Sequence, residues 1–361
     1  RCTAGAACAG LLFGLAAGLK LTALPYCLAG AVALLLVPGH PSTSRLSRIG
    51  AYVLGCVFAT LLLVGPWCMV LFDRYRNPIF PFMNNWFGSP FVDPLPFTDQ
   101  RFKPRDLVQA LAYPAFWAIQ PTTLVNELPV RDARFAVACV ASVGTLAWHA
   151  LYRRASAPRP DRGLLLSVFF VTAFAFWELA FSLLRYLATL ELLTGTMVVI
   201  ALRPLLERPR ARMPLAIGCT VLGVVVISTA VYPDWGRMPS PRPVQITLPP
   251  IAPGSLVILL DPAPMAYLAD LVPPAIPFVG ANNNLIRPGH GGLLSRQAEN
   301  MIRAHTGPLY GLEEPSQAPG IADQTLDYYG LARNGCSQVV SNLDNNAIRL
   351  CRLTAAHSHS P

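Results

Sequence analysis

Four charged residues stand within segments of the chain that are otherwise apolar: Lys20, Glu178, Arg185 and Glu191. A charge inside a membrane-spanning helix is costly and is usually kept for function. The order of the apolar segments lets the four converge near one face, with Lys20 and Arg185 as functional cations and the two glutamates as supporting charges. Alternatively, Lys20 and Arg185 reach out to the interface from helix ends, and Glu178 forms an internal ion pair with Arg185. Both interpretations stay open for the cations, and the structural one is favoured for the glutamates.

A second group of polar residues lies in the stretch DRYRNPIFPFMNNWFGSPFVDP, from Asp73 to Pro94. Asp73, Arg74 and Arg76 follow directly on an apolar segment, where cations could hold a phosphate and a carboxylate could act as a base or hold a divalent metal. Asn84 and Asn85 could hydrogen-bond sugar hydroxyls, although an Asn pair is equally typical of a turn. The prolines of this stretch favour a fixed, shaped loop.

The composition indicates a membrane protein. Of the 361 residues, 53% are hydrophobic and 13% are charged, whereas soluble domains carry about 25% charged residues. The chain begins at Arg1 without an initiator Met, which is typical of a fragment or a processed product. No Walker A loop or GxSxG elbow is present. His149 and His290 are isolated in sequence, so we expect no metal site at either.

Seven apolar segments are long enough to cross about 30 Å of hydrocarbon, which takes roughly 17 to 25 residues of helix. They are Cys2 to Leu19, Leu21 to Val37, Gly50 to Phe72, Phe135 to Tyr152, Leu164 to Leu184, Tyr186 to Leu206 and Pro214 to Tyr232. Lys20 separates the first two without an obvious loop, so these two form either a helical hairpin or one broken helix. The fold class expected for residues 1–233 is therefore an α-helical polytopic membrane domain.

The arginines predict how this domain is oriented. They gather in loops 38–49, 153–163 and 203–213, and basic short loops stay on the cytoplasmic side. The long loop 73–134 and everything after residue 233 then lie outside the cytoplasm. Within that long loop, LVQALAYPAFWAIQ is apolar but too short to span, which indicates an interfacial or re-entrant helix. Because the net charge of +9 sits largely in the basic loops, no nucleic-acid partner is needed to explain it.

The end of the chain has a different texture. Residues 234–254 are rich in proline and indicate a linker, and residues 255–361 alternate short apolar runs with amphipathic segments, which predicts a small soluble α/β domain. Of nine cysteines, Cys336 and Cys351 alone lie in this domain. In an oxidising compartment they could form a disulfide, and two unpaired thiols are equally compatible with the sequence.

Three segments resemble the membrane glycosyltransferases of the GT-C class, which include protein mannosyltransferases and the aminoarabinose transferases of bacterial lipid A. They are GLLFGLAAGLKLTAL, RNPIFPFMNNWFGSPF and RYLATLELL. The resemblance implies transfer of a sugar from a polyprenyl-phosphate donor in the bacterial inner membrane, by an inverting displacement, with the C-terminal domain in the periplasm. It makes Lys20 and Arg185 ligands of the donor phosphate and the Asp73 to Asp99 loop part of a lid.

The resemblance gives no catalytic residue in this chain. The class places its catalytic acid in its first extracytoplasmic loop, and no segment here matches that loop. It requires no cofactor, although a divalent cation is compatible with it, and it names a membrane lipid and a lipid-linked sugar as partners. Two alternatives remain: a transporter or flippase, and a non-catalytic membrane protein whose periplasmic domain binds a partner. The oligomeric state is not predicted.

Overall fold

The computed structural model describes residues 2–39, 44–94, 99–152, 161–235, 244–316, 319–343 and 348–356. It divides into two compact units. The first comprises Arg1–Trp67 and Thr98–Arg237, and the second comprises Cys68–Phe97 and Met238–Pro361. Arg153, Arg154 and Arg159 of the predicted cytoplasmic loops lie outside the described residues, as do residues 236–243 of the predicted linker.

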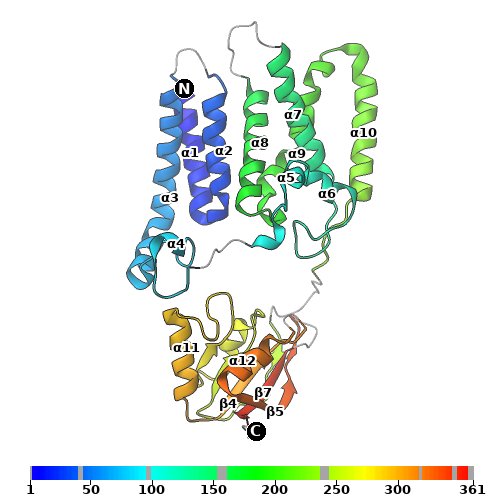
Figure 1. The fold of residues 1–361 in the computed structure, drawn as a ribbon. Coiled ribbons are helices and arrows are strands. Elements are labelled where there is room, and N and C mark those ends of the chain that lie inside the picture. Colours follow the sequence, from blue (N-terminus) through cyan, green and yellow to red (C-terminus); the bar gives the residue numbers. More distant parts are fainter. Residues whose placement is uncertain are drawn as a thin grey trace. The chain divides into compact units, whose positions relative to one another are not determined.

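The first unit is a bundle of long apolar helices (Figure 1). Five of them are long and apolar enough to cross a membrane: α3 (Arg45–Tyr75), α7 (Arg134–Tyr152), α8 (Arg162–Ala180), α9 (Ala188–Leu206) and the segment Pro209–Thr229, which contains α10 (Arg212–Thr229). The remaining two apolar helices, α1 (Cys2–Leu19) and α2 (Leu24–Leu36), are shorter. The prediction of a mostly helical first domain is confirmed, and five of the seven predicted spans are helices compatible with a multi-pass membrane protein.

The helices alternate in direction, so their connections gather at two ends. The last turns of α2, α7 and α9 and the first turns of α3, α8 and α10 lie at one end of the unit, and α5 (Leu107–Leu111) and α6 (Tyr113–Ile119) lie at the other (Figure 1). The first end carries the arginines at the starts of α3 and α8 and between α9 and α10. The two apolar turns α5 and α6 are each too short to span a membrane.

An aromatic cluster fills the bundle beside α6. Trp117 is fully buried, and its ring lies 5.1 Å from that of Tyr113 and 6.3 Å from that of Phe135. Trp177 of α8 packs on the same group. These rings bury a large apolar area in edge-to-face contacts, which stabilise more than area alone. They fix α6 against α7 and α8, so the loop that carries α6 has one defined position on the bundle.

A glycine at every fourth position allows α1 to approach α3 closely. A Cβ added to Gly10 would lie 2.1 Å from the carbonyl oxygen of Tyr52, and one added to Gly14 would lie 2.3 Å from that of Cys56. The Thr60 hydroxyl donates a hydrogen bond to the Gly14 carbonyl, at 3.0 Å. Small residues at this spacing let helix backbones pack in lipid, where no hydrophobic force drives helices together.

Lys20 interrupts the first apolar stretch. It is extended, at φ −150° and ψ 112°, and is followed by the 3₁₀ turn Leu21–Ala23 and by Pro25 in the first turn of α2. The extended residue ends α1, and the proline favours a new helix start. Helices α1 and α2 pack against each other, so this region is a helical hairpin rather than one broken helix.

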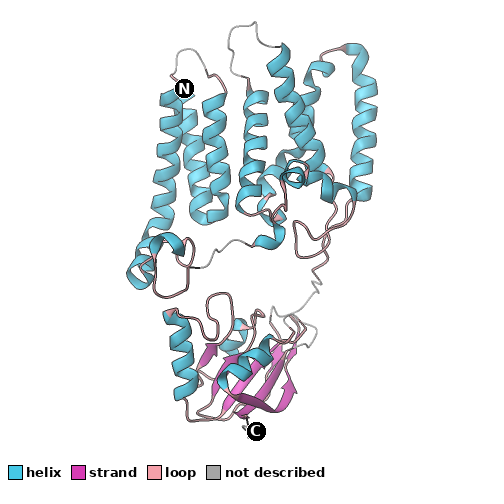
Figure 2. Cartoon of the chain, viewed as in Figure 1, coloured by secondary structure: helices cyan, strands magenta, loops and turns pink. Residues whose placement is uncertain are grey.

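The second unit contains a small α/β fold (Figure 2). Its five-stranded sheet has the order β3-β2-β4-β7-β5. Strands β2 (Leu256–Leu259), β3 (Phe278–Gly280) and β4 (Leu309–Glu313) are parallel, and β7 (Arg349–Ala355) is antiparallel to β4 and to β5 (Leu331–Gln338). Strands β1 (Ile246–Thr247) and β6 (Val340–Ser341) form a separate pair. Apolar side chains fill both sides of the sheet, as the predicted α/β domain requires.

Helices α11 (Leu293–Ala304) and α12 (Ile321–Tyr329) pack on this sheet. The segment before residue 98 also belongs to this unit. The backbone amides of Leu293 and Leu294 donate to the carbonyls of Pro90 and Phe91, and His290 bonds Asp93 at 2.8 Å. The loop after α3 is therefore a structural part of the unit that contains the α/β fold.

Candidate functional site

The structure brings Lys20 and Arg185 together on one aromatic ring. The Lys20 ammonium lies 4.9 Å from the centre of the Tyr186 ring, and the Arg185 guanidinium carbon lies 5.5 Å from it. Lys20 projects from the break between α1 and α2, and Arg185 from the 3₁₀ turn Leu184–Tyr186 that joins α8 to α9. Two separate helix breaks thus bring two cations to one ring, through cation–π contacts.

The turn under these cations is held by its neighbours. The Tyr26 hydroxyl donates to the Tyr186 carbonyl, and the Leu184 amide donates to the Val125 carbonyl at 2.7 Å. Both cations are exposed. Arg185 pairs with Glu127 at 3.1 Å, whereas Lys20 forms no ion pair within the described ranges. The site can therefore offer one uncommitted ammonium and one guanidinium to an anion.

Glu127 was not singled out from the sequence. It lies in the segment NELPVRD between α6 and α7. A carboxylate in a polar loop gives no sequence signal of a functional role. The two glutamates that were expected near Arg185 have other partners. Glu191 accepts a hydrogen bond from Arg134 at 2.7 Å, and Arg134 also binds Asp132, so these charges tie the start of α7 to α9.

Glu178 lies near the end of α8 and is 9% exposed. Its Oε1 has no hydrogen-bond partner among the described residues. The Lys103 ammonium lies beside it and donates to the carbonyls of Glu178 and Leu179. Burial lowers the pKa of Lys103, and the charge of Glu178 opposes that shift. Glu178 is thus a supporting charge for Lys103 rather than for Arg185.

The loop residues predicted to bind substrate lie in the second unit. Asp73, Arg74 and Arg76 are exposed at the end of α3, and Asn85 is exposed on the short helix α4 (Asn84–Phe87). Asn84 is different, because it is 2% exposed. Its amide nitrogen donates to the carbonyls of Ser89 and Val92, at 3.0 and 2.8 Å, and its Oδ1 accepts from the Ser89 amide at 2.9 Å. Asn84 therefore holds the loop closed.

Replacing Asn84 by alanine should unfold this loop, whereas the same change at Asn85 should be neutral. The Asn84→Ala variant leaves two carbonyls and one amide without their partner, which costs about 2 kcal/mol when such groups are buried. The measurement is the rate at which trypsin or chymotrypsin cuts between residues 73 and 94 in the detergent-solubilised protein. Equal cleavage of the two variants would show that the Asn84 amide does not order the loop.

A polar cavity of about 580 Å³ opens in the second unit. Its walls include Asn282, Asn283 and Asn284 after β3, together with Arg287 and Tyr328. This is the edge where parallel strands end, the usual place for ligands in open α/β sheets. This cavity was not predicted from the sequence, although three consecutive asparagines directly after a predicted strand are a signal for it.

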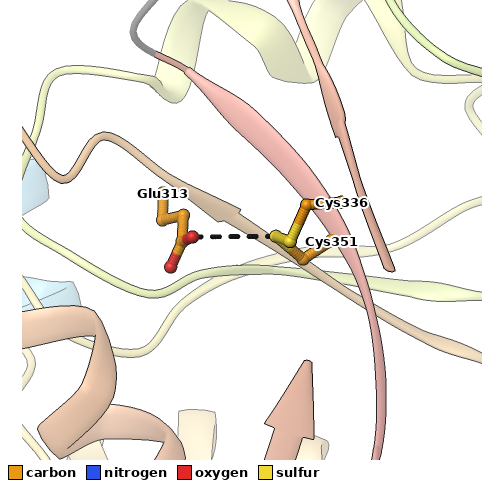
Figure 3. A group of neighbouring side chains, drawn as sticks. All are labelled: Glu313, Cys336 and Cys351. Atoms are coloured by element: carbon orange, nitrogen blue, oxygen red, sulfur yellow. Dashed lines mark hydrogen bonds between the residues drawn. A yellow bond between two sulfur atoms is a disulfide. The ribbon is translucent and has the colours of Figure 1, made fainter. Parts of the chain in front are cut away.

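One group of potential metal ligands in this unit does not make a metal site. Glu313, Cys336 and Cys351 lie together (Figure 3), but the two cysteines form a disulfide between β5 and β7. A disulfide sulfur carries no hydrogen, so the 3.6 Å approach of Cys351 Sγ to Glu313 is a contact. Glu313 is instead bound by Arg333 and Arg349, at 2.5 and 2.7 Å. These side chains are structural.

The two histidines that are isolated in sequence each meet a carboxylate. His149 Nε2 lies 3.0 Å from Asp161, and His290 Nδ1 lies 2.8 Å from Asp93. Each pair joins two segments of its own unit. One histidine and one carboxylate are too few ligands for a structural metal.

No family model, no curated protein and no solved structure matches this chain.

Proposed function

We propose that this chain is part of a membrane glycosyltransferase that moves a sugar from a polyprenyl-phosphate donor to an acceptor outside the cytoplasm. The observation that supports it best is the placement of Lys20 and Arg185 over the Tyr186 ring. A polyprenyl-phosphate sugar carries its phosphate where apolar chain meets water, and the cation pair stands where apolar helices end. The two cations are the ligands that such a phosphate needs.

The two side chains suit different parts of the same group. A guanidinium can bind two phosphate oxygens with parallel hydrogen bonds, and an ammonium acts as a compact point charge. Tyr186 limits the freedom of both side chains, which reduces the entropy lost on binding. Glu127 holds Arg185 in place and keeps its charge compensated until the phosphate arrives.

The proposed topology has seven crossings. The arginine-bearing ends of α3, α8 and α10 face the cytoplasm by the positive-inside rule, and Lys20, Arg185 and the α/β fold lie on the periplasmic side of a bacterial inner membrane. A disulfide in the second unit suits that compartment. Helices α1 and α2 cross as a hairpin whose short length is compensated by packing on α3 and α8. We assign no catalytic residue and no divalent cation.

The test is sugar transfer by the natural full-length protein. Membranes containing it are supplied with radiolabelled polyprenyl-phosphate sugars, and label is followed into acceptor and free sugar. Transfer or hydrolysis above that of membranes lacking the protein supports the proposal. Absence of turnover with pentose, hexose and amino-sugar donors alike would refute it.

The polar cavity of the second unit favours a second candidate, a membrane-anchored protein that binds a saccharide without transferring it. Amide groups with a tyrosine and an arginine provide the donors and acceptors that sugar hydroxyls need. If the cavity binds saccharides, Arg287→Ala should weaken the binding of soluble oligosaccharides to the full chain about tenfold. The control is Arg352→Ala, which removes an exposed arginine of β7 and should leave the affinity unchanged. Calorimetry measures the affinity of each variant. Identical affinities would exclude the cavity as the saccharide-binding site.

A further inference from the structure

A second candidate lipid site lies inside the helical unit, among α1, α2, α3, α8 and α9. There the structure contains an apolar cavity of about 730 Å³, a size typical of ligand pockets. Alanines, glycines, leucines and Phe13 and Phe169 form most of its wall. The cavity is separate from the exposed cation pair at Tyr186, because neither Lys20 nor Arg185 lines it.

The cavity is long as well as apolar. Gly163, at the start of α8, packs against Ile200 near the end of α9. Thr189, which also lines the cavity, lies about three turns before Ile200 on α9. At 1.5 Å per residue about 16 Å separates Thr189 from the level of Arg162, and residues of α1, α2 and α8 line the cavity between these two levels. A linear hydrocarbon chain fits a space of this shape.

Arg48 stands at the arginine-bearing end of this cavity. It is 7% exposed and lines the cavity, yet it forms no ion pair with any described residue. Its guanidinium lies over Gly39, where an added Cβ would be 1.8 Å from Nη1. Residue 39 must therefore lack a side chain for Arg48 to take this position. A buried guanidinium without a counter-charge is costly, so this position indicates an anionic ligand.

The other charged residues at this end of the cavity are either bound to other groups or exposed at its rim. Asp161 caps α8 by accepting from the amides of Gly163 and Leu164, and it also bonds His149. Arg162 is exposed at the rim of the cavity and can add a second positive charge. The Tyr52 hydroxyl, which also lines the cavity, donates to the Cys27 carbonyl.

We propose that the cavity binds a phosphate-bearing lipid, with its phosphate on Arg48 and Arg162 and one hydrocarbon chain between α1, α2, α8 and α9. The apolar wall selects the chain and the buried guanidinium selects the anionic headgroup. Its two arginines lie at the opposite end of the bundle from the cation pair, and the site does not depend on the proposed transfer reaction.

The experiment measures ligand binding to the full chain in a maltoside detergent, by calorimetry and by thermal stabilisation. The probes are oleoyl lysophosphatidic acid, monooleoylglycerol, which lacks the phosphate, and inorganic phosphate, which lacks the chain. We expect lysophosphatidic acid to bind and stabilise the protein, and the other two probes to bind roughly 10- to 100-fold more weakly. Inorganic phosphate binding as well as the lipid would show a free-anion site and refute a lipid site.

Three variants test the residues. Arg48→Gln should reduce lysophosphatidic acid binding to the level of monooleoylglycerol, and Arg208→Ala, an exposed arginine at the same end but outside the cavity, should leave it unchanged. Ala9→Trp fills the cavity without touching a charge and should abolish binding of both oleoyl probes. Retained lysophosphatidic acid affinity in Arg48→Gln or in Ala9→Trp overturns the proposal, and the second variant decides the matter if the first fails to fold.

Discussion

Alanine at Lys20 or at Arg185 is expected to lower sugar transfer about 100-fold, the scale on which single electrostatic contacts to a developing charge act in enzymes. The leaving group of the proposed reaction is the polyprenyl phosphate, which gains negative charge as the sugar departs. Lys20 and Arg185 are the cations that meet over the Tyr186 ring. Each therefore stabilises the transition state more than the bound donor.

The control is Arg101→Ala. Arg101 is an exposed arginine of the same unit, held by Asp99 at 2.6 Å and stacked on Phe102, so its removal deletes an equal charge and a cation–π contact at a different ring. Tyr186→Phe keeps the ring that both cations use and should retain transfer. Transfer is measured with radiolabelled donor in membranes that contain equal amounts of each variant.

Equal turnover in the Lys20, Arg185 and Arg101 variants would contradict the assignment. The two cations would then only anchor helix ends at the interface, as long basic side chains commonly do. In that case a transporter or a saccharide-binding protein becomes the better account of the chain, and the cavity beside Asn282–Asn284 becomes the first site to probe.

The meeting of Lys20 and Arg185 at one end of the bundle could be predicted from the sequence. Both stand at breaks between apolar segments, and counting the segments places both breaks on the same side. The pairing of Arg185 with Glu127 could not, because Glu127 lies in a loop, and its position depends on how Tyr113 and Trp117 seat α6 against α7 and α8. Short-range patterns carry no information on such contacts.

For the Asp73 to Pro94 loop, too, the sequence predicted the local shape but not the long-range contacts. Its prolines predicted a shaped loop, and the structure stacks Tyr75 on Phe80 with ring centres 4.3 Å apart. Whether an asparagine faces solvent or closes the loop is decided by burial, which separates Asn84 from its neighbour Asn85. The contact of Pro90 and Phe91 with α11 joins segments about 200 residues apart in the chain, and no local signal predicts it.

Strands β2, β3, β4 and β7 were visible as apolar runs, whereas most of β5 (LARNGCSQ) and the order of the strands were not. Strand β2 lies between β3 and β4, and β7 lies between β4 and β5. Because β3 is an edge strand, Asn282–Asn284 follow the last strand on that side of the sheet. The same order brings Glu313 of β4 close to Arg349 of β7 and Arg333 of β5. The residues next to Glu313 in sequence do not predict its ion-pair partners, because these partners come from strands later in the chain.

Glutamine at Glu313 is expected to destabilise the second unit by about 3 kcal/mol, the typical cost of breaking a buried ion pair from one side. The Glu313 side chain is fully buried and lies between Arg333 of β5 and Arg349 of β7. Glutamine has the same shape but lacks the charge that compensates two guanidinium groups. For a domain of this size the midpoint of thermal unfolding should fall by roughly 10–20 °C.

The matched control is Glu299→Gln in the same unit. Glu299 pairs with Arg303 one turn away on α11, at 2.8 Å, and such pairs on a helix surface contribute about 0.5 kcal/mol or less. Thermal unfolding is followed by near-ultraviolet circular dichroism, with trypsin cleavage between residues 244 and 356 as a second readout. Both substitutions remove one carboxylate charge, but Glu313 is fully buried between two arginines, whereas Glu299 is partly exposed and accepts from Arg303 and from the Tyr328 hydroxyl.

The arginine variants should then follow the burial of their side chains. Arg333→Ala should cost more than Arg349→Ala, because the Arg333 side chain is 29% exposed and also binds Asp323, whereas that of Arg349 is 45% exposed. All measurements keep the Cys336–Cys351 disulfide oxidised, since it joins the same two strands. If Glu313→Gln unfolds at the temperature of Glu299→Gln, the charge network adds nothing, and the disulfide with the apolar faces of the sheet must hold β4, β7 and β5 together.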